Sequence, residues 1–244
     1  MERIILILTV FIVCVCNSIK VHAQIHSGTI LFERKTNIIK KYPGFSDFVK
    51  DYGMDKTVSD YFTLQFNDSV AFYGPSNDIQ STGGMFSSFI ENHSYLDNLN
   101  HRTRITQLDM GGEYFLLSDT ISTKQWKITD SKRKIADFKC RKAIWQKNDT
   151  TRIYAWFTEE IIPEIGPEGV TGLPGAILGL ATEDGSMVYF AQSVTVQPID
   201  KSDINFSYKK KKVMKLNELI LKVIALLGEK EGNEKLEKEL FYWR

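Results

Sequence analysis

The stretch Trp156–Leu180, WFTEEIIPEIGPEGVTGLPGAILGL, holds three prolines and five glycines within 25 residues. Proline restricts φ and glycine permits positive φ, so this composition predicts a series of fixed turns. Ile161, Ile165 and Val170 lie between these turns and are too apolar for a loop in water. We therefore expect a buried, rigid loop that leads into a strand at residues 176–182. The loop either closes the core or shapes a ligand site, because glycines also let a partner approach the backbone.

The chain on either side of this stretch reads as short strands separated by polar turns. Residues 61–66 alternate in part between apolar and polar side chains, as expected of a sheet with one dry and one wet face. Asp184-Gly185 is a strong hairpin signal, because a tight primed turn requires positive φ. The expected strands are 30–32, 61–66, 70–73, 103–108, 114–117, 125–129, 139–146, 152–157, 176–182 and 187–196. This pattern predicts a mainly β fold with a large curved antiparallel sheet, half-barrel or sandwich-like.

Two regions depart from this strand pattern. Residues 75–100 are rich in Ser, Asn, Gly and Asp, which predicts a long loop or flap. Apolar residues recur at helical spacing between Val213 and Leu227, and Gly228 follows where a helix usually ends. We expect an amphipathic helix there and a second short helix over 233–243, with Leu236, Leu240 and Trp243 on one side. The first helix either packs on the sheet or anchors the protein to a membrane surface.

The first 23 residues have the features of a secretory signal peptide. Arg3 precedes an apolar run from Ile4 to Cys16 that is too short for an ordinary membrane-spanning helix. Val21-His22-Ala23 resembles a cleavage site, so we expect the mature chain to begin at Gln24. A lipoprotein signal using Cys14 or Cys16 is the alternative. The expected organisation is a signal peptide at 1–23, an antiparallel β domain at 24–200 and a C-terminal helical tail at 201–244, without a transmembrane span in the mature chain.

Composition excludes several classes of protein. The chain has 244 residues, 43% hydrophobic and 25% charged, with a net charge of +1, so no global field favours nucleic acid. Removal of the signal peptide would leave Cys140 as the only cysteine, without an internal disulfide or a CxxC motif. We expect Cys140 to be a small buried side chain rather than a reactive thiol. No cofactor is expected.

Few residues have the spacing of a catalytic or metal site. The motifs of serine hydrolases, zinc proteases, P-loops and dinucleotide-binding loops are absent. His93 and His101 flank the end of the 75–100 loop, and we expect both on the surface without a metal, because no third ligand is suitably spaced. Glu159 and Glu160 cannot both enter one cleft if they continue a strand, because adjacent strand residues face opposite sides. No catalytic residue is assigned.

The stretch Gly172 to Ile177 reads GLPGAI. It resembles the signature of the GLPGLI family, exported envelope proteins of Bacteroidota-type bacteria, with Ala176 where the family name has Leu. DFKCRKA at 137–143 is similar to the family's cysteine-bearing strand. AWFT at 155–158 and QWKI at 125–128 are similar to its tryptophan strands, and Gly166-Pro167 takes the expected place before the turn. The resemblance covers roughly residues 28 to 225.

This resemblance implies export, a periplasmic or outer-membrane-associated location and a β-rich fold, but carries over no catalytic residue. We expect a non-enzymatic binding or accessory module whose partner is an outer-membrane or envelope protein, a peptide or a lipid. The candidate binding residues are Trp156, Glu159, Gly172, Leu173, Pro174 and Gly175. The alternative is a hydrolase of unfamiliar type that uses Glu159 or Glu164 with a loop histidine.

Overall fold

A computed structural model describes residues 24–82, 92–110, 113–204, 212–237 and 242–243. The predicted signal peptide, residues 1–23, lies outside the described residues. Within the described part of the chain, no helix is both long enough and apolar enough to cross a membrane.

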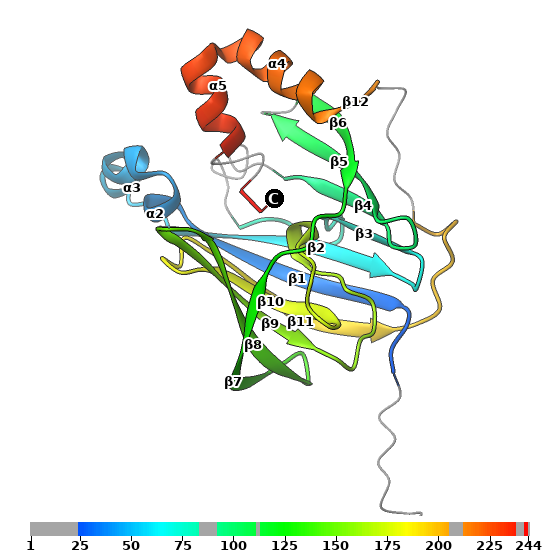
Figure 1. Ribbon diagram of the computed structural model, residues 1–244. Helices are drawn as coiled ribbons and strands as arrows, with labels where there is room; N and C mark the ends of the chain where they lie inside the picture. Colours follow the sequence, from blue (N-terminus) through cyan, green and yellow to red (C-terminus); the bar gives the residue numbers. More distant parts are fainter. Residues whose placement is uncertain (1–23, 83–91, 111–112, 205–211, 238–241, 244) are drawn as a thin grey trace, which may run out of the picture.

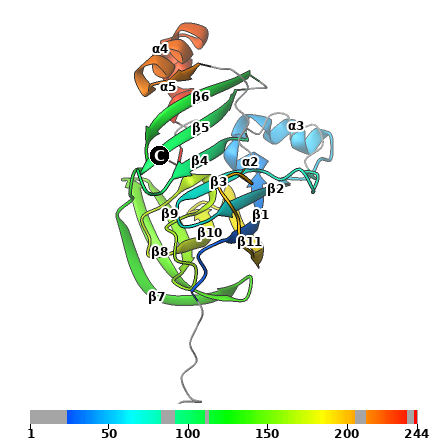
Figure 2. The ribbon, with the colours of Figure 1, turned by 90° about the vertical axis from the view of Figure 1, so that its right-hand side faces the viewer.

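Twelve strands form one curved sheet in the order β12-β6-β5-β4-β3-β2-β1-β11-β10-β9-β8-β7 (Figures 1 and 2). All neighbours are antiparallel except β12 and β6. The predicted mainly β fold with one large curved sheet is confirmed. The strands are β1 Gly28–Asn37, β2 Thr57–Phe66, β3 Val70–Pro75, β4 Ser94–Asn98, β5 Thr103–Met110, β6 Glu113–Thr120, β7 Trp126–Ile135, β8 Phe138–Asn148, β9 Thr151–Thr158, β10 Ala176–Thr182, β11 Met187–Val196 and β12 Val213–Met214.

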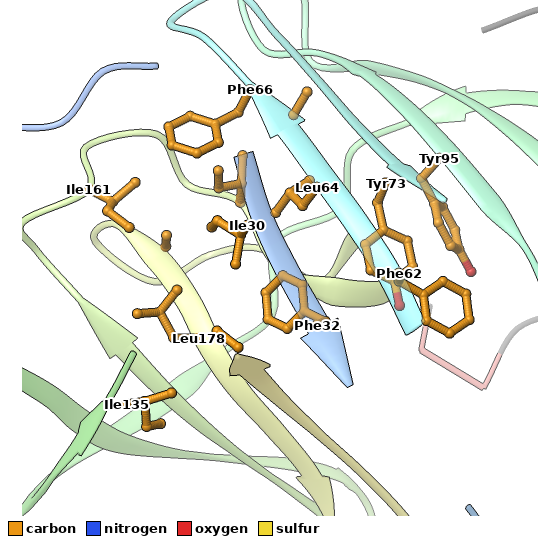
Figure 3. Close-up of a cluster of buried hydrophobic side chains, with 14 of the residues drawn as sticks. Ile30, Phe32, Phe62, Leu64, Phe66, Tyr73, Tyr95, Ile135, Ile161 and Leu178 are labelled. Atoms are coloured by element: carbon orange, nitrogen blue, oxygen red, sulfur yellow. The ribbon is translucent and has the colours of Figure 1, made fainter. Parts of the chain in front are cut away.

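Buried and more exposed side chains alternate along β1 and β2, and this alternation determines which face of the sheet is buried. Ile30 and Phe32 stand directly opposite Leu64 and Phe62, and all four side chains are buried. Burial of this apolar area is the main stabilising contribution to the sheet. Figure 3 shows these side chains with others of the same cluster, which also contains Ile161 from the loop after β9. We call the face of β1–β5 and β11 that this loop covers the inner face.

The loop between β9 and β10 is buried, as predicted. Ile161, Ile165, Val170 and Leu173 are each at most 1% exposed. Its one-turn 3-10 helix η3, Pro167–Gly169, lies against β3, β4 and β10. A buried loop must satisfy its backbone polar groups internally, and here Ala176 N–H bonds to the Ile161 carbonyl.

The predicted loop at 75–100 is shorter than expected, because β4 forms within it. Tyr95 and Asp97 are buried and Leu96 is half-buried, so the segment alternates as a strand. It pairs with β3 and β5. Residues 83–91 of the same connection lie outside the described residues.

Short helical segments precede β2 and follow β12. Sequence patterns did not indicate α2 Ile38–Lys41, η1 Pro43–Phe45 and α3 Ser46–Asp51, which are too short for a clear helical period. The predicted amphipathic helix is α4, Leu216–Leu227, and it ends at Gly228 with φ 84° as expected. Leu219 and Val223 pack it against Leu117 of β6.

The prediction for the second C-terminal helix was wrong in its range. Helix α5 spans Glu229–Lys235 and starts directly after Gly228, with Glu229 and Glu231 in its first turn. Acidic side chains are favourable at that end of a helix. Leu236 packs with the α4 cluster, whereas Trp243 joins the cluster around Tyr189, so the two do not share one helix face.

Candidate functional site

A row of polar side chains crosses the inner face near the middle of the sheet. Arg34 of β1 stands directly opposite Tyr189 of β11 and Asp60 of β2. Its Nη2 donates to Asp60 Oδ2 at 2.8 Å and to Asn92 Oδ1 at 2.7 Å. The guanidinium also lies over Phe62, 4.6 Å from the ring centroid. These contacts compensate the burial of a charge that would be costly alone.

The carboxyl group of Glu168 in η3 lies over this row. The hydroxyls of Tyr189, Tyr95 and Tyr73 donate to it at 2.9, 3.2 and 3.4 Å, and Arg34 Nη1 lies 3.9 Å from its Oε1. Glu168 is 4% exposed. Burial raises the pKa of this carboxyl above its ordinary value, although Arg34 and the tyrosine hydroxyls act in the opposite direction. Residues from four strands and one loop therefore meet at a single carboxyl group.

The backbone of η3 is held in an unusual conformation. Glu168 has φ 55° and Gly169 has φ 66°, in the left-handed region that residues other than glycine rarely adopt. Arg104 Nη2 donates to the Gly169 carbonyl at 2.6 Å while Nε and Nη2 bind both Asp97 oxygens, each at 2.6 Å. Such a conformation persists only where its surroundings fix it, and it is frequent at ligand sites.

Two small cavities meet at Glu168 and Trp243, which line both. The volume of each is about 40 Å³, which leaves room for a few water molecules. The first cavity opens toward β4, β5 and β6. The second opens toward β1, β11 and α2. The other lining residues are Tyr95, Arg104, Thr106, Leu108, Leu117, Asp119, Thr120 and Ser122 in the first, and Arg34, Thr36, Lys41, Tyr42, His93, Met187, Tyr189 and Tyr242 in the second.

Thr36 lines the second cavity, and its buried hydroxyl has no hydrogen-bond partner among the described residues. Thr36 is 1% exposed, so water at the molecular surface does not reach it freely. A buried polar group without a partner costs about 1–3 kcal/mol. This hydroxyl is therefore an unsatisfied buried polar group beside the second cavity.

The end of the chain covers the two cavities. Trp243 is 8% exposed and packs edge-to-face on Tyr189, with ring centroids 5.6 Å apart. Lys147 Nζ donates to the Tyr242 carbonyl at 2.5 Å. The ammonium groups of Lys147 and Lys41 lie 4.3 and 4.5 Å from the Tyr242 ring centroid. In Figure 1 the C-terminal end accordingly lies inside the curve of the sheet.

His93 is buried, so the prediction of a surface histidine was wrong at this position. It lies immediately before β4, is 6% exposed, and its Nδ1 accepts the Asp109 backbone N–H at 3.1 Å. Burial, with a smaller effect from Arg34 and Lys235, lowers the pKa of His93 to about 3. The imidazole is therefore neutral at physiological pH. His101 is exposed, as expected.

Four of the six predicted binding residues form the turn that closes the loop. Leu173 is buried, Gly172 has φ 96° and Gly175 has φ 112°. A side chain at Gly175 would come within 2.1 Å of the Thr158 carbonyl oxygen. Pro174 is exposed. None of these four lines either inner cavity, and their packing shows how the loop is held in place.

The other two predicted binding residues line neither inner cavity: Trp156 faces the outer side of the sheet, and Glu159 follows the end of β9. Trp156 alternates with buried neighbours on β9 and packs against Phe190, with ring centroids 5.6 Å apart. Glu159 is exposed and 3.5 Å from Arg141. Because β9 ends at Thr158, Glu159 and Glu160 do line one hollow. No histidine is among the described residues that line it. Glu164 is exposed.

The same hollow is lined by Cys140, which is 0% exposed as a residue, as predicted. Burial raises the pKa of its thiol to about 12, so the thiol is protonated and unreactive at neutral pH. No group of metal-binding side chains occurs among the residues that the structure describes.

Sequence patterns did not indicate the inner site, because the glycines and prolines around it have the stronger local signal. Two signals in the sequence could have indicated it. Arg34 and Asp60 occupy positions of an apolar alternation, two residues after Phe32 and two before Phe62. A charged residue on a dry strand face requires a buried partner. Glu168 likewise stands between Gly166-Pro167 and Gly169 in a stretch that is mostly apolar.

Comparisons with known proteins bear on the fold alone. No family model matches this sequence, and no curated protein matches it. Solved structures of PNGF-II in two crystal forms superpose on this chain with TM-scores of 0.50 and 0.49 at 14% sequence identity. Each superposition covers 78% of this chain and 31% of the PNGF-II chain. The structure of an uncharacterized conserved protein from Thermus thermophilus superposes with a TM-score of 0.41 at 4% sequence identity. That superposition covers 78% of this chain and 90% of the Thermus protein. This chain thus spans under a third of PNGF-II and has a similar sheet-rich fold.

Proposed function

We propose that this chain is an exported, non-enzymatic binding module of the cell envelope, with its ligand site on the inner face beside Glu168. The observation that carries the proposal is the pair of polar cavities that meet at this carboxyl. Their walls contain the buried Arg34, the half-buried Arg104, the neutral imidazole of His93 and Thr36, whose hydroxyl has no partner among the described residues. Export is supported by the signal-peptide features of residues 1–23 and by the resemblance to the GLPGLI family.

The charged groups of the inner-face site already have hydrogen-bond or ion-pair partners within the protein. This favours ligand binding over hydrolysis. Both Glu168 oxygens accept tyrosine hydroxyls, and Asp60 and Asp97 are paired with arginines. A general base must be free to accept a proton from the substrate or a water. The alternative, a hydrolase using Glu159 or Glu164, has less support, because both are exposed and no histidine is among the described residues that line the hollow beside Glu159.

Photo-crosslinking in cells tests the location of the site. Thr120 is exposed and lines the first cavity, so a photoreactive amino acid at 120 fits without disturbing the core. We expect this position to capture a specific peptide, lipid or envelope protein, identified by mass spectrometry. The matched control is a photoreactive amino acid at Lys134, which is exposed on β7 at the opposite edge of the sheet. Capture of the same species at both positions, or at neither, would contradict the proposal.

A conservative substitution then tests the role of the cavity. Thr36→Val removes the hydroxyl and keeps the shape, so it should leave the melting temperature unchanged or raise it. We expect it to reduce capture at position 120 severalfold. Thr63→Val, on the opposite face of β2, serves as the control and should not change capture.

A further inference from the structure

Tyr242 and Trp243 combine packing against the cluster around Tyr189 with specific contacts from charged side chains. Two lysines from distant parts of the chain, Lys41 and Lys147, direct their ammonium groups at the Tyr242 ring, and Lys147 also binds the Tyr242 carbonyl. Trp243 fills the space between the two cavities against Tyr189. A bound peptide with an aromatic side chain can make the same cation–π contacts and the same hydrogen bond through a backbone carbonyl.

We propose that the inner-face site recognises a peptide segment with two adjacent aromatic residues, and that Tyr242-Trp243 occupies it as a built-in competitor. This inference rests on the proposed function and names the ligand class for the same site. The ligand takes the same contacts as the tail: one ring under the two lysines, one carbonyl on Lys147, and one ring against Tyr189 above Glu168.

The size and polarity of the site support this class of ligand. With the tail in place, each cavity has a volume of only about 40 Å³. A ligand larger than a few water molecules must therefore displace Trp243. A saturated acyl chain in its place would leave Arg34 and Glu168 facing hydrocarbon, which is costly. An indole or phenol ring has an apolar body and a polar edge, which matches a wall of tyrosines and charged groups.

Competition by the tail makes a quantitative prediction. A tethered segment acts at an effective concentration of roughly millimolar, so it weakens the apparent affinity of an external peptide. The probe is a fluorescein-labelled peptide of residues 236–244 of this chain. We expect the full-length double variant Tyr242→Ala/Trp243→Ala to bind this probe at least about tenfold more tightly than the natural chain does, by fluorescence polarisation.

Two controls separate recognition from nonspecific adhesion. The same peptide with alanine in place of its Tyr and Trp should not bind. In the double variant, Lys147→Met should weaken probe binding severalfold, whereas Lys139→Met, in the hollow beside Glu159, should not. Equal binding to the natural chain and the double variant, or binding to neither, would overturn the inference. Photo-crosslinking at Thr120 reports independently whether the site takes some other ligand.

A second measurement uses the natural sequence in case the double variant folds poorly. The chain contains four tryptophans, so labelling with 5-fluorotryptophan gives few ¹⁹F signals, and Trp243→Phe identifies that of Trp243. Excess unlabelled peptide should shift the Trp243 signal saturably toward its solvent-exposed position. Trp156, on the outer face, is the internal control. An unchanged Trp243 signal at a saturating concentration of peptide would contradict displacement of the tail.

Discussion

His93 and Glu168 both lie on the inner face, and burial shifts their pKa values in opposite directions. Burial disfavours the charged form of each, so it lowers the pKa of the imidazole and raises that of the carboxyl. Each shift links the free energy of unfolding to pH with a definite sign.

Replacing His93 should remove part of the sensitivity to acid. Its pKa falls from an ordinary 6.5 to about 3, so the unfolded chain binds the proton more readily and stability is lost as the pH falls below about 6.5. Between pH 7 and pH 5 this loss amounts to about 2 kcal/mol. His93→Gln keeps an acceptor for the Asp109 N–H, and we expect urea unfolding to show that loss reduced. The exposed His101→Gln should retain it; equal losses in both variants would refute the assignment.

Glu168 should produce a pH dependence of the unfolding free energy with the opposite sign. Because its folded pKa is raised, its contribution to stability is present at low pH and is lost as the pH rises through the folded pKa. Glu168→Gln mimics the protonated carboxyl, so its unfolding free energy should be less dependent on pH between about pH 4 and pH 8. The control is Glu164→Gln, which is exposed. Identical pH profiles for the natural chain and Glu168→Gln would contradict a buried, titrating carboxyl.

Turns decide how the elements of the sheet are joined, and their glycines differ in how much space surrounds them. Gly175 and Gly185 both have positive φ. At Gly185 an added side chain would meet only the flexible end of Lys40, at 3.7 Å. At Gly175 it would collide with the backbone of Thr158 and Ile161. The two positions therefore separate backbone strain from steric exclusion.

Alanine at these glycines should have unequal effects. Gly185→Ala adds only the strain of a left-handed residue and should cost about 1–2 kcal/mol. Gly175→Ala must also shift the loop that carries Glu168, so we expect a loss of at least about 4 kcal/mol. Thermal unfolding measures both. Similar losses would mean that the loop relaxes easily and that its turn does not determine the position of Glu168.

Sequence patterns predicted most elements because they have a strong local signal. Ten strands, the hairpin turn at Gly185 and the helix ending at Gly228 follow from alternation, helical spacing and glycine positions. Strand β4 was missed because Ser94–Asn98 is short and polar, and its inward Tyr95 and Asp97 have partners on other strands. The site was missed for the same reason: Glu168 meets Tyr73 and Tyr95 through pairing of distant segments, which no local pattern encodes.

At the scale of the whole molecule, the first described residues are joined to the loop after β9 by backbone hydrogen bonds. Ile25 N–H donates to the Glu160 carbonyl at 2.8 Å, and the Ile25 carbonyl accepts from Ile162 N–H at 2.9 Å. The chain is therefore fixed to the loop after β9 from its second mature residue onward, if it is cut before Gln24.

We expect the exported protein to begin at Gln24. Signal peptidases require a small residue before the cut, so Ala23→Leu should accumulate uncleaved precursor, whereas Ala23→Gly should be processed normally. Intact mass of the protein from the envelope fraction gives the answer. A mature chain that starts at Cys14 or Cys16 with attached lipid would instead support the lipoprotein alternative.

The position of β1 has a consequence for folding. Strand β1 pairs with the next strand, β2, on one side and with the distant strand β11 on the other. The side chains of Gln197 and Thr29 are hydrogen-bonded although 168 residues separate them in the sequence. Closing so long a loop is slow compared with forming a hairpin. The segments β2–β6 and β7–β11 can each collapse early, yet their joint at β1 forms only once β11 has been made. A chain that stops before Met187 would leave one side of β1 as an open edge, prone to pair with another copy.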